Sequence, residues 1–295
     1  MREELRRLRH DGAGPLGQQG ALEVFVASAD AIPTILHEIG RLREISFREV
    51  GEGSGKELDL DDYDRRYLHL FLWDNEAGEV AGAYRLGRTD RLLADYGPEG
   101  LYCSTLFEFE EAFLAHLTPG LELGRSFVAP NYQRSLGALM MLWKGIGQFV
   151  ARHPCYARLF GPVSISRDYT SISKNLIVRF LREEKRDESL APFVHPTNPY
   201  RLEVPDEISP RLESIEQVSA RVAEVEPDGK GVPVLLRQYL KLNATLLEFN
   251  VDPQFCNCLD ALLMVDLRTA PEAILKRYMG KAAYQRFREG SAIPD

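Results

Sequence analysis

The chain has 295 residues, 44% of them hydrophobic, which is enough to build one large core and argues against a disordered chain. Its formal charge of −8 argues against nucleic acid as the main partner, because phosphate binding requires a net basic surface. The four cysteines follow no regular spacing, so we expect a reduced, cytoplasmic protein without a metal centre.

No apolar run approaches the roughly 18 residues that a membrane-spanning helix needs. Four N-terminal arginines could still lie against anionic lipid and give a peripheral membrane contact; a solvated charged tail is the alternative. They are Arg2, Arg6, Arg7 and Arg9. Residues 12–20 are rich in Gly and Gln, and we expect residues 1–20 to form a flexible lead-in.

Apolar periodicity and turn residues predict the elements that follow. In chain order we expect a strand (21–27), a helix (30–48), two hairpin strands (67–73, 79–86), a helix (107–116), a strand (121–128), a long helix (135–152), a strand (159–165), three helices (172–182, 213–225, 232–242), two strands (245–250, 261–267) and a helix from 271. Mixed strands and helices in this order predict a single α/β domain.

The loop between the strand at 121–128 and the long helix has the clearest chemical content. It reads Asn131-Tyr-Gln-Arg-Ser-Leu-Gly-Ala-Leu139. The free N–H groups and the dipole at the helix start can hold a phosphate or pyrophosphate, and Arg134 adds a positive charge. An ordinary capped helix, with Gly137 placed for close packing, is the alternative.

This loop resembles the acyl-CoA and phosphopantetheine loop of the GNAT acyltransferases through Arg134-x-x-Gly137-x-Leu139. Leu139 stands where that loop usually has a small residue, which fits the branch that takes acyl carrier protein. A second set resembles the signature of acyl-homoserine-lactone synthases, long-chain N-acyl amino acid synthases and ornithine-lipid (hemolysin-like) N-acyltransferases. It comprises Arg43-x-x-x-Phe47, Asp61-x-Tyr63-Asp64, Tyr67-Leu68, Arg85 and Glu122-x-x-Arg125.

Segments 161–166, 231–240 and 251–255, the last followed by Asp260, are similar to the bacterial ornithine- and glycine-lipid enzymes, so the resemblance covers roughly residues 21–285. It implies a GNAT-like fold, a central mixed, splayed sheet flanked by helices, in one domain at 21–290 with an insertion at about 168–230. It also implies a fatty acyl thioester as co-substrate, on the 4′-phosphopantetheine of acyl carrier protein or on coenzyme A, with no tightly bound cofactor. The residues that would hold this thioester are Phe127, Val128, Arg134, Ser135, Gly137 and Ala138.

Glu122 is the candidate general base, because an amine must lose a proton before it attacks a thioester. A structural salt bridge with Arg125 is the alternative. Strict alternation puts these two residues on opposite faces of a strand, so both can face one cleft only across a bulge near Gly124. GNAT enzymes have a bulge on this strand, and it would free N–H groups near Phe127 and Val128 to polarise the thioester carbonyl.

Other candidates bind the acceptor or the acyl chain. Asp61 or Asp64, together with Arg43, would hold a loop closed over the site. The alternative is that the two aspartates lie in a solvated loop. Arg85 would bind an acceptor carboxylate, or form an ordinary ion pair. Apolar residues that line an acyl channel, or simply the core, include Phe47 and Trp143.

The expected activity is transfer of a long, 3-hydroxylated fatty acyl group to the amine of an amino acid such as ornithine or glycine, giving a lyso-aminolipid. An acyl-homoserine-lactone synthase and a catalytically silent acyl-carrier or lipid-binding module are the alternatives. Acyl carrier protein is acidic, so its docking requires a basic surface on this protein. Six basic residues are candidates for this surface, and an ordinary solvated helix is the alternative. The candidates are Arg152, Arg158, Arg179, Arg182, Lys185 and Arg186.

Overall fold

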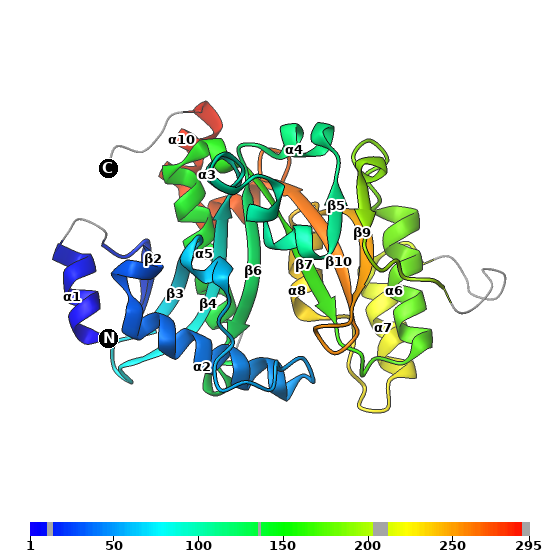
Figure 1. Ribbon diagram of the computed structural model, residues 1–295, viewed down its shortest axis with the longest axis horizontal. Helices are drawn as coiled ribbons and strands as arrows, with labels where there is room; N and C mark the ends of the chain where they lie inside the picture. Colours follow the sequence, from blue (N-terminus) through cyan, green and yellow to red (C-terminus); the bar gives the residue numbers. More distant parts are fainter. Residues whose placement is uncertain (11–13, 135–136, 203–211, 291–295) are drawn as a thin grey trace.

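The computed structural model describes residues 1–10, 14–134, 137–202 and 212–290. Their main sheet has the order β1-β2-β3-β4-β6-β7-β10-β9, and β5 and β8 form a small second sheet (Figure 1). The strands are β1 (Gly17–Gln19), β2 (Leu22–Ser28), β3 (Leu68–Asp74), β4 (Glu79–Arg88), β5 (Phe107–Phe109), β6 (Leu121–Val128), β7 (Arg158–Ile165), β8 (Val194–Pro196), β9 (Thr245–Asp252) and β10 (Cys258–Asp266). Every strand expected from the sequence is therefore present.

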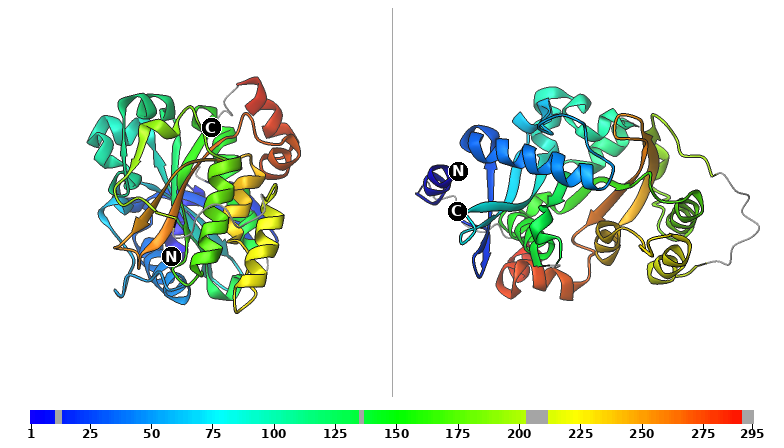
Figure 2. Two further views of the ribbon diagram at one scale, coloured as in Figure 1. Left: turned by 90° about the vertical axis from the view of Figure 1, so that its right-hand side faces the viewer. Right: turned by 90° about the horizontal axis from the view of Figure 1, so that it is seen from below.

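Helices cover both faces of the main sheet. They are α1 (Arg2–His10), α2 (Pro33–Glu49), α3 (Thr89–Tyr96), α4 (Glu111–Leu117), α5 (Gly137–Arg152), α6 (Ser171–Glu184), α7 (Ile215–Val225), α8 (Val234–Lys241), α9 (Glu272–Met279) and α10 (Lys281–Glu289). Seen from below, α2 lies on one side of the strands, and α5, α9 and α10 lie on the other (Figure 2, right). Within the described part of the chain, no helix is long and apolar enough to cross a membrane.

The first ten residues are a docked helix, in contrast to the flexible lead-in expected. Leu5 and Leu8 of α1 are buried in a cluster with apolar residues of α2 and of strands β2, β3 and β4. The buried Glu4 carboxylate accepts hydrogen bonds from the backbone N–H groups of Thr34 (2.7 Å) and Ile35 (2.9 Å). Its negative charge therefore caps the start of α2, whose preceding residue has no capping side chain.

The helix expected at 107–116 is divided into two elements. Phe107–Phe109 forms β5, which pairs with β8, and α4 begins at Glu111. The partner strand lies about 90 residues further along the chain, so no local pattern could indicate this pairing.

The sheet splits between β6 and β7. These parallel strands pair at Leu121 with Leu159 and at Glu122 with Phe160, and then diverge (Figure 1). At the branch point, an added Cβ on Gly161 would lie 2.0 Å from the Leu123 carbonyl oxygen, so only glycine fits there. Pro162 follows and supplies no N–H to either neighbouring strand. The expected mixed, splayed sheet flanked by helices is confirmed.

Candidate active site

A bulge in β6 shapes the edge that faces the split. Arg85 of β4 pairs with Gly124 and Ala83 pairs with Phe127, so Tyr84 alone opposes both Arg125 and Ser126. Arg125 takes up the extra residue with a positive φ of 48°. A left-handed backbone is costly for a residue with a Cβ, and such strain is concentrated at functional sites. The bulge expected near Gly124 is therefore present, with Arg125 as its strained residue.

The bulge places Glu122 and Arg125 on the same face of the sheet. Glu122 accepts a hydrogen bond from the backbone N–H of Tyr102, and the Arg125 guanidinium stacks 4.8 Å from the centre of the Tyr102 ring. A second ring, that of Phe255, lies 4.9 Å from the same guanidinium. Arg125 is thus held between two aromatic rings at the edge of the split.

Beyond the bulge, the backbone directions on β6 can be assigned. Ala129 donates its N–H to the Ala81 carbonyl of β4, and Phe127 pairs with Ala83 two residues earlier. Antiparallel pairs alternate between hydrogen-bonded and non-bonded, so the peptide groups of Phe127 point to β4. Those of Val128 point away from β4, toward the open side. Of the two residues expected to polarise the thioester, Val128 is the better placed.

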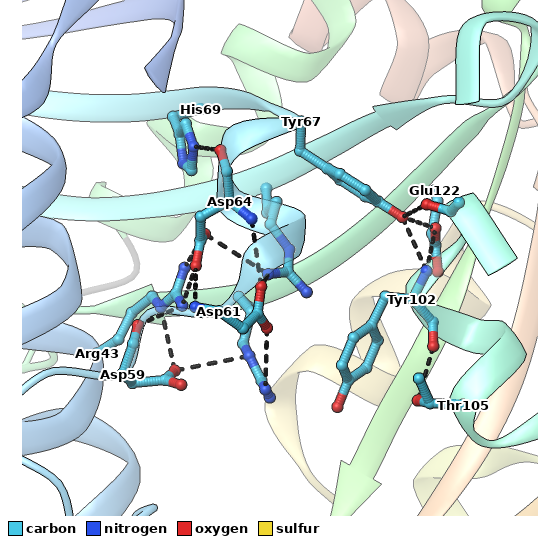
Figure 3. Close-up of polar contacts among 12 residues, drawn as sticks. Arg43, Asp59, Asp61, Asp64, Tyr67, His69, Tyr102, Thr105 and Glu122 are labelled. Atoms are coloured by element: carbon cyan, nitrogen blue, oxygen red, sulfur yellow. Dashed lines mark hydrogen bonds and ion pairs between the residues drawn. The ribbon is translucent and has the colours of Figure 1, made fainter. Parts of the chain in front are cut away.

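Three arginines and three aspartates form an ionic cluster beside β4 and β6, part of which is drawn in Figure 3. Arg43 of α2 contacts Asp59 (3.1 Å) and Asp64 (2.8 Å). Arg85 contacts Asp61 at 2.6 Å. Arg125 lies 3.6 Å from Asp59 and 3.6 Å from Asp61, too far for a hydrogen bond. Five of these six residues were candidates from the sequence, and Asp59 was missed because no motif residue marks it.

The cluster joins α2 to the loop before β3. Burial raises the pKa of Asp64, but the Arg43 and Arg85 guanidinium groups outweigh burial and hold that pKa well below its ordinary value. Asp61 and Asp64 also cap each other's backbone N–H groups across the turn between them. The solvated-loop interpretation does not describe Asp64, which is 2% exposed. The arrangement fits the role of holding this loop in place.

Arg85, the expected carboxylate-binding residue, is 1% exposed and bound to Asp61. Its guanidinium lies 5.1 Å from the ring centres of both Tyr67 and Tyr102. Neither recess described below is lined by it. Arg85 therefore holds Asp61, Tyr67 and Tyr102 in place and does not itself line a recess.

Glu122 is buried, and both oxygens of its carboxylate accept hydrogen bonds (Figure 3). One oxygen accepts the Cys103 N–H at 2.6 Å, and the other accepts the Tyr102 N–H at 3.1 Å and the Tyr67 hydroxyl. The described structure has no ion pair between Glu122 and Arg125, which was the alternative. These contacts fix the segment that carries Tyr102 against β6 and occupy three of the roughly four lone-pair sites of the carboxylate, and Glu122 lines neither recess described below.

Two connected recesses lie at the split. The inner recess measures about 130 Å³ and is lined by Phe47, Glu52, Tyr102, Leu106, 124–126, 162–164, Leu235, Asp252, Phe255 and Asp260. The outer recess measures about 610 Å³ and includes Lys56, Asp59, Asp61, Tyr63, Thr105, Asn198 and Asn250, and it shares Tyr102, Leu106, Arg125, Asp252 and Phe255 with the inner one. Phe47 belongs to α2 and Leu235 to α8, which lie on opposite sides of the sheet (Figure 2, right), so the inner recess is lined from both faces at the gap between the diverging strands.

The inner recess contains two carboxyl groups to which the sequence assigned no role: Asp260, which only marked the family resemblance, and Glu52. Burial raises the pKa of Asp260 on β10 to about 7, and Asp252 adds to this by repulsion, against the hydrogen bond from Ser164. Burial raises the pKa of Glu52 to about 7 as well, with repulsion from Asp260 and Asp168. Burial of each group depends on how α2, β7 and β10 pack together, and no local sequence pattern reports that.

The remaining expected residues lie away from the recesses. Trp143 of α5 is 2% exposed and packs between Tyr239 (5.2 Å) and Tyr278 (5.9 Å) in the core. Ala138 is buried in the same core, Gly137 begins α5, and Arg134 is exposed. Ser135 lies outside the described residues. Phe47 does line the inner recess, as expected for a substrate contact.

The candidate docking surface for acyl carrier protein is largely paired with acidic groups. Arg182 and Arg186 contact Glu248 at 3.3 Å and 3.1 Å, and Arg179 contacts Glu183 at 2.8 Å. These ion pairs reduce the positive charge that α6 presents.

Comparison with known proteins gives three findings. The acetyltransferase (GNAT) domain matches residues 42–144, which include the C-terminal part of α2, the ionic cluster, β6 and the first half of α5. A glycine N(alpha)-acyltransferase of Bacteroides thetaiotaomicron is 33% identical over 245 residues, covering 77% of this chain and 71% of that protein. A protein of the same name from Phocaeicola vulgatus is 33% identical over 242 residues, covering 77% of this chain and 74% of that protein.

Solved structures of two acyl-homoserine lactone synthases also align with the chain. The CoA-dependent synthase MesI aligns with a TM-score of 0.42 and 12% identity, covering 88% of this chain and 95% of that one. The synthase LasI aligns with a TM-score of 0.43 and 13% identity, covering 95% and 99%.

Proposed function

Since the chain belongs to the family of these two glycine N(alpha)-acyltransferases and matches the acetyltransferase (GNAT) domain, it is an acyltransferase, and we propose that it joins a fatty acyl group to the α-amine of glycine. The acyl group is long and 3-hydroxylated, and the donor is the phosphopantetheine thioester of acyl carrier protein. The product is an N-acyl amino acid that can serve as a lyso-aminolipid.

The observation that carries this proposal is the recess through the split sheet. It is lined by polar groups, among them Arg125 and Ser126 on β6, and by the apolar side chains of Phe47, Leu235 and Phe255. An extended thioester arm needs such a passage, because its reacting carbonyl must meet an amine from one side while its chain continues into apolar surroundings. The N–H of Val128 on the open edge of β6 is the proposed donor to the thioester oxygen.

Arg125 is the proposed partner of the acceptor carboxylate. It lines both recesses, its side chain is 14% exposed, and its Nε has no hydrogen-bond partner within the described residues. Guanidinium geometry matches a carboxylate, and a buried N–H that lacks a partner gains from binding one. Glycine adds no side chain to be accommodated beside Tyr102 and Phe255, which flank the guanidinium.

The experiment supplies purified protein with 3-hydroxyacyl thioesters on acyl carrier protein and on coenzyme A. Glycine, alanine, ornithine and S-adenosylmethionine are offered separately, and products are identified by mass spectrometry. We expect acyl-glycine as the main product, formed faster from the carrier protein. Acyl-homoserine lactone from S-adenosylmethionine would identify a signal synthase instead, and no acylated amine from any acceptor would identify a binding module.

A further inference from the structure

The inner recess contains two buried carboxyl groups, those of Asp260 and Glu52, that lack some or all of the hydrogen-bond and ion-pair partners a buried carboxylate normally has. Asp260 is 3% exposed, and one of its oxygens accepts a hydrogen bond from the Ser164 hydroxyl at 2.7 Å and faces the Cys258 thiol at 3.6 Å. Its other oxygen has no hydrogen-bond partner in the described parts of the chain. Glu52 is 9% exposed and lines the same recess, and its carboxylate makes neither a hydrogen bond nor an ion pair with any described residue.

Such an arrangement is unfavourable for folding alone. Buried carboxylates are normally paired, because burial of an unpaired charge costs several kcal/mol or forces protonation. Here the cost is not removed by a cation, although Arg125 lines the same recess and offsets part of the charge. Perturbed acids at a cavity with missing partners are typical of functional groups. Glu122 is the opposite case, since its two oxygens accept three hydrogen bonds and lie outside the recess.

We propose that Asp260 is the proton acceptor of the acyl transfer and that Glu52 acts through it, as a positioning residue whose charge tunes Asp260. This inference rests on the proposed acylation of an amino acid. With the acceptor carboxylate on Arg125, the amine enters the inner recess, which Asp260 lines together with Arg125.

In this step the acceptor ammonium gives one proton to Asp260, and its nitrogen lone pair forms the C–N bond to the thioester carbon. The C–S bond then breaks, and the departing sulfur takes the second proton from the same nitrogen, which leaves an amide and a free thiol. Asp260 releases its proton to solvent before the next cycle.

A carboxylate with a pKa near 7 suits this task. It accepts a proton from an amine more readily than an ordinary aspartate does, yet it is still ionised at slightly alkaline pH. The charged and titratable groups around Asp260 are Arg125 on β6, Asp252 on β9, Cys258 on its own strand, Glu52 from the loop after α2, and Tyr102 and Cys103 from the segment that contacts Glu122, with Asp168 next to Glu52. Removing the Glu52 charge should lower the pKa of Asp260.

The test measures kcat at saturating acceptor against pH for the wild type and the variants Asp260→Asn, Asp260→Glu and Glu52→Gln. The wild type should lose activity on acidification with a midpoint near pH 7. Asp260→Asn should lower kcat about 100-fold or more and abolish this acidic limb. Asp260→Glu should recover part of kcat together with the limb, and Glu52→Gln should shift the limb to lower pH. Asp266→Asn, on the same strand, and the exposed Glu49→Gln are matched controls that should change neither quantity.

Asp260→Asn within about fivefold of wild-type kcat, or with an unchanged limb, would overturn the proposal. The proposal would also be overturned if Asp260→Asn is folded, as judged by a thermal melt, but no longer binds a non-hydrolysable analogue of the thioester donor. If that variant does not fold, an acidic limb that stays at the same pH in Glu52→Gln refutes the role by itself. A wild type that acylates no amine refutes the proposed function instead, so the two failures are distinct.

Discussion

Gly161→Ala tests the physical cause of the split sheet. In the structure an added Cβ would lie 2.0 Å from the Leu123 carbonyl oxygen and 3.1 Å from its carbon, where ordinary contact begins at 3.4 Å. Both sides of this contact are backbone, so no side-chain rotation relieves it and β6 and β7 must separate by more than about 1 Å. Overpacking of this kind costs about 1–3 kcal/mol, and we expect the upper end.

Gly124→Ala is the matched control, since it adds the same methyl group to the neighbouring strand with no atom within 4 Å and no positive φ. It should leave the free energy of unfolding within about 0.5 kcal/mol, or raise it slightly by restricting the unfolded chain. Thermal melts followed by circular dichroism compare the two, and about 3 kcal/mol corresponds to a fall of several degrees in Tm. Equal melting temperatures for both variants would refute the close approach at Gly161.

Two further predictions concern charge and packing. Because the pKa of Asp64 is lowered in the folded state by Arg43 and Arg85, its contribution is complete above about pH 4 and is lost as pH falls below that value. Urea unfolding of Asp64→Asn should therefore show a weaker loss of stability on acidification than wild type; parallel curves would contradict the ion pairs. Trp143→Ala should cost about 3–5 kcal/mol while preserving the preference among acyl chain lengths, whereas a changed preference would place Trp143 at the acyl site.

The sequence by itself determined most elements and much of the residue set near the site. Strand β6 begins and ends where its alternation and Pro130 predicted. Glu122 and Arg125 share a face across a bulge, as expected, because strand periodicity is a local property of the backbone. Family resemblance supplied the residues of the ionic cluster except Asp59, which follows no motif.

Only the tertiary structure decided what these residues do. Glu122 is a plausible base in the sequence, but the Tyr102 segment folds back and occupies its oxygens. The sequence assigns no role to Glu52, and it marks Asp260 only through the family resemblance. Both acquire their raised pKa values because β10 and the loop after α2 meet at one recess. Burial, pairing and unpaired oxygens depend on contacts between distant segments, and such contacts leave no local pattern to read.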